Sequence, residues 1–511
     1  MADESQLSPF TFPLQGGLVL DQSPFSMQPG MALELENFEP SVTGGYRRIN
    51  GFSKYVTAIV PQTSASTEDV LMVTSFAGKV MAARGEKIFS ADVGGSSWTE
   101  RDNGRSNAKR YTFEKFNFDG NDKIIVADQA NAPTVFNTSF AATDVTSAGT
   151  GEVSTAVTGA KFVVAFKDHM FYAGMASTPQ EIVFSEPFDE DDFDTSDGAG
   201  SIKVDDDITG LKVFRDALFI FCESRIFQLT GTSSSNFAIT PITRNIGCVN
   251  GFTIQEFAGD LIFLSKDGLR TVAATARIGD VELGTISRPV QSLFSSETDV
   301  DEFVSLVIPE KTQYRIFFAN SDLTEANTKG IICVRKDSGY EFSELKGIQP
   351  NCTDTSIVSG DSVILHGGFN ANSYVFRQEQ GSQFDSTTII GKYRSPNLTM
   401  GDAGIRKNFQ RAIINYSPEG ALNTDLFLRY DYDSPDVANP AAYPFDSSKV
   451  VAIYGSATYN TSTYGGQSTP LTRQPIEGSG FAIALKIVDN AVSLPYALKG
   501  FQLEFDVGAR R

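Results

Sequence analysis

Short apolar runs separated by polar turns repeat along most of the chain. Runs rich in Val, Ile, Phe and Tyr occupy residues 123–127, 182–184 and 315–318, and Gly, Asp, Asn or Ser bound them. Such runs are typical of β-strands, and no long segment keeps the apolar spacing of an amphipathic helix. The best helical candidate, residues 31–37, is about two turns long. The pattern therefore predicts an almost entirely β chain.

One motif returns at a nearly constant interval: an apolar run, a tight polar turn, then a strongly apolar strand. The residues at its turn are Asp122, Asp168, Asp216, Asp260 and Asp361, with weaker copies at Asp69 and Gln313. Tight hairpins favour Gly, Asp and Asn, which tolerate positive φ or form side-chain turns. Neighbouring copies are 44 to 53 residues apart, close to the length of a four-stranded propeller blade. We therefore predict a β-propeller of six to seven blades over residues 45–383, with stacked sandwiches as the alternative fold.

The two ends of the chain differ from this repeat. Beyond residue 383 the predicted strands become longer. Phe501, Leu503 and Phe505 alternate with polar residues, which indicates a sheet with one buried and one solvent-exposed face. We predict a separate C-terminal β-sandwich domain over residues 384–511. Residues 1–44 contain five prolines and few strand signals, so we interpret them as an extended N-terminal arm that could dock on a neighbouring subunit. Truncating such an arm should block assembly and leave the monomer folded.

Composition narrows the functional classes. The 511 residues carry a net charge of −20, are 41% hydrophobic, and include 40 Phe but only two His and four Cys. This content excludes a disordered chain and lacks the basic excess of a protein that wraps DNA. The isolated cysteines are predicted to be buried thiols. With no secretory start and no apolar run of about 18 residues, we expect no membrane anchor and synthesis in the cytoplasm.

Carboxylates provide the main candidate site. Two acidic runs contain Asp189, Glu190, Asp191, Asp192 and Asp194, and then Asp205, Asp206 and Asp207. Clustered carboxylates can hold Ca²⁺, but their spacing does not fit an EF-hand loop. They could also serve glycoside hydrolysis, or simply form solvated loops.

No other pattern indicates catalysis. Phosphate-binding glycine loops and a nucleophile elbow are absent from the sequence, and His169 and His366 are interpreted as packing or turn residues. We therefore predict no catalytic residue, no cofactor and no metal. Candidate partner contacts are the basic pair Arg47 and Arg48 and the aromatic loop residues Tyr454, Tyr459 and Tyr464.

Segments at the start, middle and end of the chain carry a family likeness. They are residues 16–25, 29–40 and 44–52, then 184–187, 208–211, 225–231, 246–249 and 265–270, and finally 498–501 and 508–511. In this order they resemble the tail nozzle (tail tube or hub) family of short-tailed bacteriophages. The likeness extends over nearly the whole chain, although each segment alone is short.

The resemblance implies a structural virion protein without catalytic residues. Members of that family contain a β-propeller and assemble as a ring, typically a hexamer, below an adaptor ring in the phage tail. The ring extends the tail channel, retains packaged DNA and lets it out on infection without sequence-specific binding. Tail fibres or tailspikes attach nearby, and the subunit is made in the host cytoplasm.

The acidic runs acquire a specific hypothesis from this resemblance. Carboxylates on a channel wall would repel DNA phosphates and prevent sticking during ejection, so we expect one or both runs to face the channel. The alternative is that the charge only maintains solubility. Two other functions stay open: a receptor-binding or fibre-anchoring protein that uses the Tyr-rich loops, and a propeller glycosidase.

Overall fold

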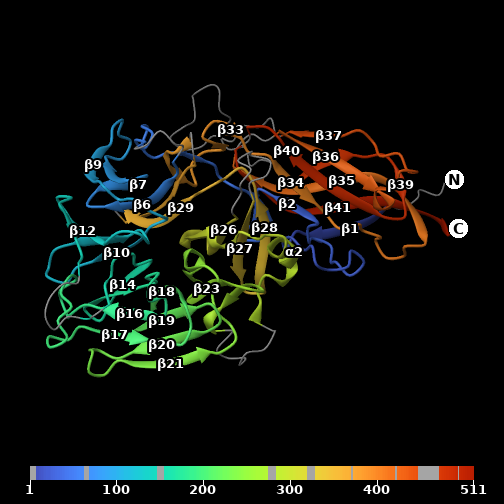
Figure 1. The fold of residues 1–511 in the computed structure, drawn as a ribbon. Coiled ribbons are helices and arrows are strands. Elements are labelled where there is room, and N and C mark those ends of the chain that lie inside the picture. The colour runs from blue at the N-terminus through green and yellow to red at the C-terminus, as the bar shows by residue number, and fades with distance from the viewer. Residues whose placement is uncertain are drawn as a thin grey trace.

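The computed structural model describes residues 7–510 with ten gaps. These gaps are residues 63–67, 147–152, 154, 274–283, 319–328, 359, 370–371, 420–422, 447–470 and 493. Two bodies lie side by side in Figure 1, a ring of radial sheets and an elongated two-sheet domain that carries both chain ends. The predicted all-β class, a propeller followed by a sandwich, is confirmed.

Among the described residues, the ring contains four separate four-stranded sheets, one three-stranded sheet, and two further four-stranded blades that are parts of larger sheets of nine and six strands. In chain order, the first blade contains β6 (Val70–Phe76), β7 (Lys79–Arg84), β8 (Lys87–Ala91) and β9 (Thr99–Asp102), the second contains β10 (Thr112–Phe116), β11 (Lys123–Ala127), β12 (Thr134–Asn137) and β13 (Ala142–Asp144), and the third contains β14 (Phe162–Phe166), β15 (His169–Ala173), β16 (Glu181–Phe184) and β17 (Gly200–Lys203). The fourth contains β18 (Ile208–Phe214), β19 (Ala217–Cys222), β20 (Ile226–Thr230) and β21 (Ala238–Thr243), and the fifth contains β22 (Gln255–Phe257), β23 (Asp260–Ser265) and β24 (Gly268–Thr271). The sixth contains β25 (Val304–Ile308), β26 (Gln313–Phe317), β27 (Gly330–Lys336) and β28 (Gly339–Leu345), and the seventh contains β29 (Cys352–Val358), β30 (Asp361–Gly367), β31 (Val375–Gln378) and β5 (Phe52–Lys54). The last blade therefore takes its outer strand from the N-terminal part of the chain, and this exchange closes the ring.

Threonine side chains join neighbouring blades at the centre of the ring. Thr112 Oγ1 donates to the Lys161 carbonyl at 2.7 Å, and Thr209 Oγ1 donates to the Cys248 carbonyl at 2.7 Å. Thr353 Oγ1 makes the same kind of bond, to the Ser305 carbonyl at 2.7 Å. Neighbouring blades belong to different sheets here, so each bond supplies a donor to a backbone carbonyl that the sheet of the other blade leaves available.

The predicted hairpin turns connect the first and second strands of the blades. Lys167 and Asp168 both have positive φ (50° and 64°), as do Ala258 and Gly259 (51° and 77°), which is the backbone of a type I′ turn. One copy of the repeat was misplaced: Asp69 precedes β6 itself, and the turn of that blade lies at Gly78, just before β7. Gly78 is 44 residues before Asp122, so the corrected turn fits the period better.

Ala258 offers a test of this turn chemistry. Its side chain is exposed and its φ is 51°, a conformation that Asn adopts more readily than Ala. We expect Ala258→Asn to raise the free energy of unfolding by roughly 0.5–1 kcal/mol. Ala258→Val should lower it instead, because a β-branched residue is strained at positive φ. Urea denaturation of the two variants measures both effects, and equal stabilities would contradict the assignment.

Two sheets form the C-terminal domain. One contains β1 (Ser8–Pro13), β3 (Phe38–Pro40), β4 (Tyr46–Arg48), β35 (Ile405–Pro418), β38 (Leu471–Pro475), β39 (Ser479–Gly480) and β41 (Tyr496–Arg510). The other contains β2 (Glu34–Glu36), β34 (Gly391–Arg394), β36 (Asn423–Tyr430), β37 (Tyr443–Asp446) and β40 (Ile483–Asp489). Their facing side chains form one core, and Phe501, Leu503 and Phe505 are buried in it, as the alternation indicated.

Residues 31–37, the best helical candidate, contain the strand β2 (Glu34–Glu36) and no helix. Their Leu-Glu-Leu-Glu sequence alternates with period two, which suits a strand. β2 pairs in parallel with β28 of the sixth blade and antiparallel with β34 of the sandwich. A single nine-stranded sheet consequently runs from the propeller into the C-terminal domain.

The N-terminal arm, expected to be extended and available to a neighbour, is integrated into its own chain. β1 pairs with β41 over its whole length, and β4 also pairs with β41. Phe12, Leu14 and Leu35 are at most 2% exposed within the sandwich core. The apolar residues between the prolines explain the difference, because burying them on the sandwich removes more apolar area from water than an extended arm would.

A few short connections complete the described chain. The helical turns are η1 (Gly251–Thr253), η3 (Arg288–Val290), α2 (Gln291–Ser295), η4 (Val300–Glu302), η5 (Pro309–Lys311) and η7 (Asp431–Asp433), and the last blade is extended by β32 (Gln383–Phe384) and β33 (Thr387–Thr388). In the part of the chain described, no helix has the length and apolarity to cross a membrane.

Candidate functional site

The first acidic run forms the loop between β16 and β17 and is largely bonded to itself. Asp192 and Asp194 accept the backbone N–H groups of Asp194 and Ser196, at 2.9 and 2.8 Å. Glu190 is buried and pairs with Lys123 of the preceding blade at 2.8 Å. A hydrogen bond with Asp189, together with burial, raises the pKa of Asp191 to about 6. The loop is a capped turn that carries excess negative charge.

The second acidic run lies between β17 and β18, at the other end of the same outer strand. Asp205 pairs with Arg225, and Asp206 Oδ2 accepts the Ser224 backbone N–H at 2.8 Å. Asp207 Oδ1 accepts the Gln180 side chain at 3.1 Å. The two runs thus lie at opposite ends of β17, and the second run leads back to the inner strand β18 of the next blade. β17 is on the side of the propeller that is distant from the sandwich (Figure 1). Within the described residues, no group of three or more His, Cys, Asp or Glu side chains could hold a metal ion.

Of the candidate partner contacts, the two arginines are bonded inside the chain. Arg48 is fully buried and pairs with Asp489, also fully buried, at 3.1 Å. Arg47 forms a bidentate contact with Glu419, at 2.6 and 2.7 Å. We therefore correct the expectation that this basic pair faces a partner: the two side chains leave opposite faces of β4, and each is bonded to an acidic group of the same chain, Arg47 to Glu39 and Glu419 and Arg48 to Asp489. Tyr454, Tyr459 and Tyr464 lie outside the described residues.

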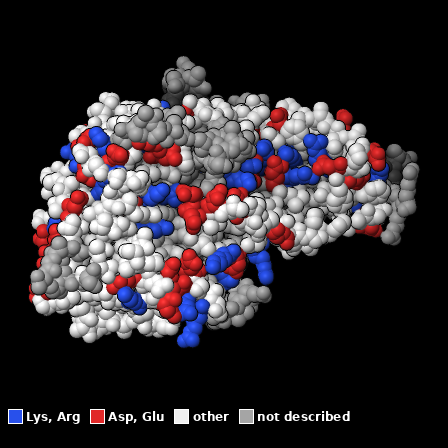
Figure 2. Space-filling model, in the orientation of Figure 1, with Lys and Arg blue, Asp and Glu red and all other residues white. Residues whose placement is uncertain are grey.

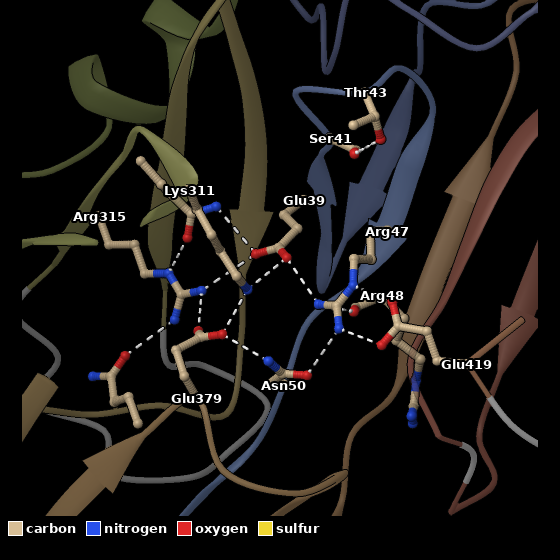
Figure 3. Close-up of polar contacts among 12 residues, drawn as sticks. Glu39, Ser41, Thr43, Arg47, Arg48, Asn50, Lys311, Arg315, Glu379 and Glu419 are labelled. Carbon is tan, nitrogen blue, oxygen red and sulfur yellow. Dashed lines mark hydrogen bonds and ion pairs between the residues drawn. The ribbon is translucent and has the colours of Figure 1, made fainter. Parts of the chain in front are cut away.

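A polar cluster that sequence reasoning did not identify fills the junction between propeller and sandwich (Figure 3). We call it the junction cluster and define it as Glu39, Arg47, Asn50, Lys311, Arg315, Glu379 and Glu419. Its bonds form a closed circuit. Lys311 Nζ reaches Glu39 at 2.7 Å and Glu379 at 2.5 Å, while Arg47 reaches Glu39 at 3.1 Å. Asn50 completes the circuit between Arg47 and Glu379, at 3.2 and 2.8 Å.

The members of the junction cluster come from every part of the fold. Glu39 and Arg47 lie on arm strands, Arg315 lies on β26 of the sixth blade, Glu379 follows the seventh blade, and Glu419 follows β35 of the sandwich. Arg315 is fully buried, and its guanidinium donates to Glu379 at 2.6 Å and to Glu39 at 3.4 Å. The cluster therefore bonds the two domains and the arm to one another.

The junction cluster gives the stability of the chain a specific pH dependence. Burial opposes the charge of Glu379, yet Arg315 and Lys311 outweigh it and lower the pKa of Glu379 from 4.5 to about 2. A carboxyl with a depressed folded-state pKa stabilises the fold above its unfolded pKa, and this stabilisation is lost as pH falls from about 4.5 towards 2. We expect Glu379→Gln to cost roughly 3 kcal/mol at pH 7 and to flatten the loss of stability in that acid range.

Urea denaturation at pH 7, 4 and 3 measures this effect. Asp92→Asn is a matched control, because the Asp92 carboxylate also accepts a lysine but is 77% exposed, so its removal should change stability little. If Glu379→Gln and the parent lose stability equally between pH 4.5 and 2, the junction cluster does not determine the acid response.

The axis of the propeller contains a cavity of about 170 Å³ lined by the inner strands. Glu114 on β10 and Lys212 on β18 both line it. Burial raises the pKa of Glu114 to about 7, and Lys212 and Lys115 oppose this only partly. A carboxyl that titrates near neutrality can act as a proton donor, but the cavity lining contains no second carboxylate.

Histidine and cysteine residues have packing roles, as predicted. His169 Nδ1 lies 2.6 Å from the Ser185 carbonyl, among phenylalanine rings. His366 is buried against Phe376, and burial lowers its pKa to about 3. All four cysteines are buried free thiols, and burial raises the pKa of Cys248 to about 12, so that thiol is not a nucleophile near neutral pH.

Comparisons with known proteins identify no family. No family model and no curated protein matches the sequence. Among solved structures, the chain is similar to the CNH domain of AfRom2, with 10% identity, a TM-score of 0.37, and coverage of 64% of this chain and 98% of that one. It is also similar to Raptor from Chaetomium thermophilum, with 9% identity, a TM-score of 0.40, and coverage of 66% and 29%. An ancestral GH74 enzyme matches with 8% identity, a TM-score of 0.39, and coverage of 66% and 53%. The chain thus spans about a third to a half of the last two, and likenesses this distant do not bear on its function.

Proposed function

We propose that this chain is a structural subunit of a bacteriophage tail, similar to the nozzle of short-tailed phages, that assembles with copies of itself into a ring around a DNA channel. The arm is the observation that carries the proposal. Residues 16–52, which hold the first segments of the family likeness, include the strands β2, β3 and β4 and the start of β5, which link the sixth blade to the sandwich, enter the sandwich and close the seventh blade. The wall of a channel that retains packaged DNA is under pressure, and two domains joined by shared sheet pairing and not by a flexible linker would resist it.

The charge distribution is compatible with a channel. Both acidic runs flank β17, one at each end of this outer strand. If this part of the propeller faced the ring axis, carboxylates from every copy would repel DNA and keep it from adhering. On the face drawn in Figure 2, by contrast, acidic and basic side chains alternate over the two domains, which suits contact with neighbouring protein surfaces. We expect partners of the ring to include an adaptor protein and tail fibres or tailspikes, with the protein located in the virion.

Electron microscopy of the purified chain and of phage particles tests the proposal. We expect a closed ring with an axial channel, and gold-labelled antibodies against the chain should mark the tail. A chain that stays monomeric at high concentration and labels no particle would refute it. A map of the ring that places both acidic runs on its outer wall would remove the channel-lining hypothesis alone.

Two alternatives make different predictions. A receptor-binding or fibre-anchoring protein would bind cells or a fibre protein as an isolated monomer. A propeller glycosidase is the second candidate because Glu114, with its pKa near 7, could serve as a general acid in the axial cavity. We expect no hydrolysis of a panel of oligosaccharides. Hydrolysis that Glu114→Gln abolishes would establish the enzyme instead.

A further inference from the structure

Two aromatic rings from distant parts of the chain form an exposed pair beside the sandwich. Phe25, on the arm loop between β1 and β2, is 84% exposed, and Tyr432, in η7 after β36, is 44% exposed. Their ring centroids are 5.7 Å apart and the planes are tilted by 44°. Rings at this separation attract one another, so the pair offers a preformed aromatic surface to solvent.

The backbone that presents Tyr432 is strained. Asp431, Tyr432 and Asp433 all have positive φ, at 48°, 63° and 60°, a conformation that costs an L-residue free energy and that glycine adopts without penalty. A glycine would give the same turn at position 432. The chain thus keeps a tyrosine at a position whose backbone conformation favours glycine.

Polar contacts fix this turn on both sides of the ring. Asp431 Oδ1 accepts the backbone N–H groups of Phe481 and Ala482, at 2.6 and 3.1 Å. Asp433 pairs with Arg394 at 2.5 Å and with Arg429 at 3.6 Å. The turn that carries Tyr432 is consequently held in place, and the charged groups next to it can donate and accept hydrogen bonds to a polar ligand.

The size of the aromatic surface limits what can occupy it. Two rings provide roughly 300 Å² of contact at most, whereas a stable protein interface needs about 800 Å² from each partner. Nucleic acid is disfavoured because the chain carries a net charge of −20. A saccharide fits, since its C–H face packs on an aromatic ring while its hydroxyls bond to neighbouring carboxylate and guanidinium groups.

We propose that Phe25 and Tyr432, with Arg394, Arg429 and Asp433 beside them, form a binding site for one or two saccharide rings. The site is separate from the axial cavity. It does not depend on the proposed tail function. Its affinity should be weak in one subunit, in the millimolar range, and a ring of copies would multiply it by avidity.

The test is a titration of the full-length protein with glucose, galactose, N-acetylglucosamine and their short oligomers, followed by saturation-transfer NMR. We expect at least one of them to bind, with Phe25→Ala and Tyr432→Ala each weakening binding at least tenfold. Phe188→Ala is the matched control, because Phe188 is 60% exposed and also has a positive φ, of 68°, but lies on the propeller. It should leave binding unchanged.

Tyr432→Gly separates binding from folding. It removes the ring and relieves the strain, so we expect lost binding with a thermal midpoint equal to or above that of the parent. A lower midpoint would make the ring structural and overturn the proposal, as would a panel in which no saccharide binds. Self-association of the parent that Phe25→Ala abolishes would assign the rings to a second copy of this chain, and would likewise overturn it.

Discussion

A chain that lacks residues 1–44 is expected to lose its folded C-terminal domain. Phe12, Leu14, Leu18, Leu35 and Phe38 from this segment are each at most 2% exposed in the sandwich core. At roughly 2 kcal/mol for each buried side chain, their removal costs on the order of 10 kcal/mol, which is comparable to the whole stability of a typical domain. The deletion also removes β2, the strand that joins the two domains. This result differs from the sequence-based expectation of a folded monomer that fails only to assemble.

Solubility on expression, limited proteolysis and circular dichroism check the deletion. We expect an aggregated product, or rapid digestion of residues beyond 389. Phe25→Ala is the control within the same segment, because its side chain is exposed and its loss should leave stability unchanged. A soluble truncated chain that unfolds cooperatively would show that the arm is dispensable for folding.

Arg48→Ala is expected to be the most destabilising single substitution that we consider. Arg48 and Asp489 are both fully buried, and the guanidinium also donates to the carbonyls of Ile389 and Ala491, at 2.7 and 3.0 Å. Removing the cation leaves a buried, unpaired carboxylate together with two carbonyls that lose a donor. Breaking a buried ion pair in this way costs about 3–5 kcal/mol.

Urea denaturation measures this loss, and a double substitution identifies its cause. In Arg48→Met with Asp489→Leu, neither charge is buried, so most of the lost stability should return. Lys79→Ala is the surface control, since its partner Asp92 is 77% exposed, and it should change the free energy of unfolding by less than about 1 kcal/mol. If the double variant were as unstable as Arg48→Ala, the stranded charge would not be the cause.

The repeated hairpins were predictable because their signal is local. Residues such as Asp168 and Asp216 mark turns whose positive φ depends on nearest neighbours, and the apolar strands that follow are read directly from the sequence. The long sandwich strands, such as β35 and β41, were predictable for the same reason. Seven such hairpins are enough to indicate a propeller from the period alone.

The pairing of strands that are distant in the sequence was not predictable. β2 and β5 are three residues each, and their partners lie hundreds of residues away, so no local pattern distinguishes them from a loop. The junction cluster was not predictable for the same reason. Arg315 lies within an apolar run, which indicates that its side chain is buried, but its partners Glu39 and Glu379 are remote in sequence. Arg47 and Arg48 were predicted to be surface groups, because the sequence does not show whether two adjacent arginines are buried beside acidic residues.

The pairing of the first strand with the last has a kinetic consequence. β1 bonds to β41, and β5 must find β31 before the propeller can close. During synthesis, each N-terminal strand waits until nearly the entire chain has left the ribosome, with its apolar side chains uncovered. Long-range pairing of this kind slows folding and favours aggregation of intermediates. Yield in cells should therefore depend on translation rate, temperature and chaperone supply more than the final stability would suggest.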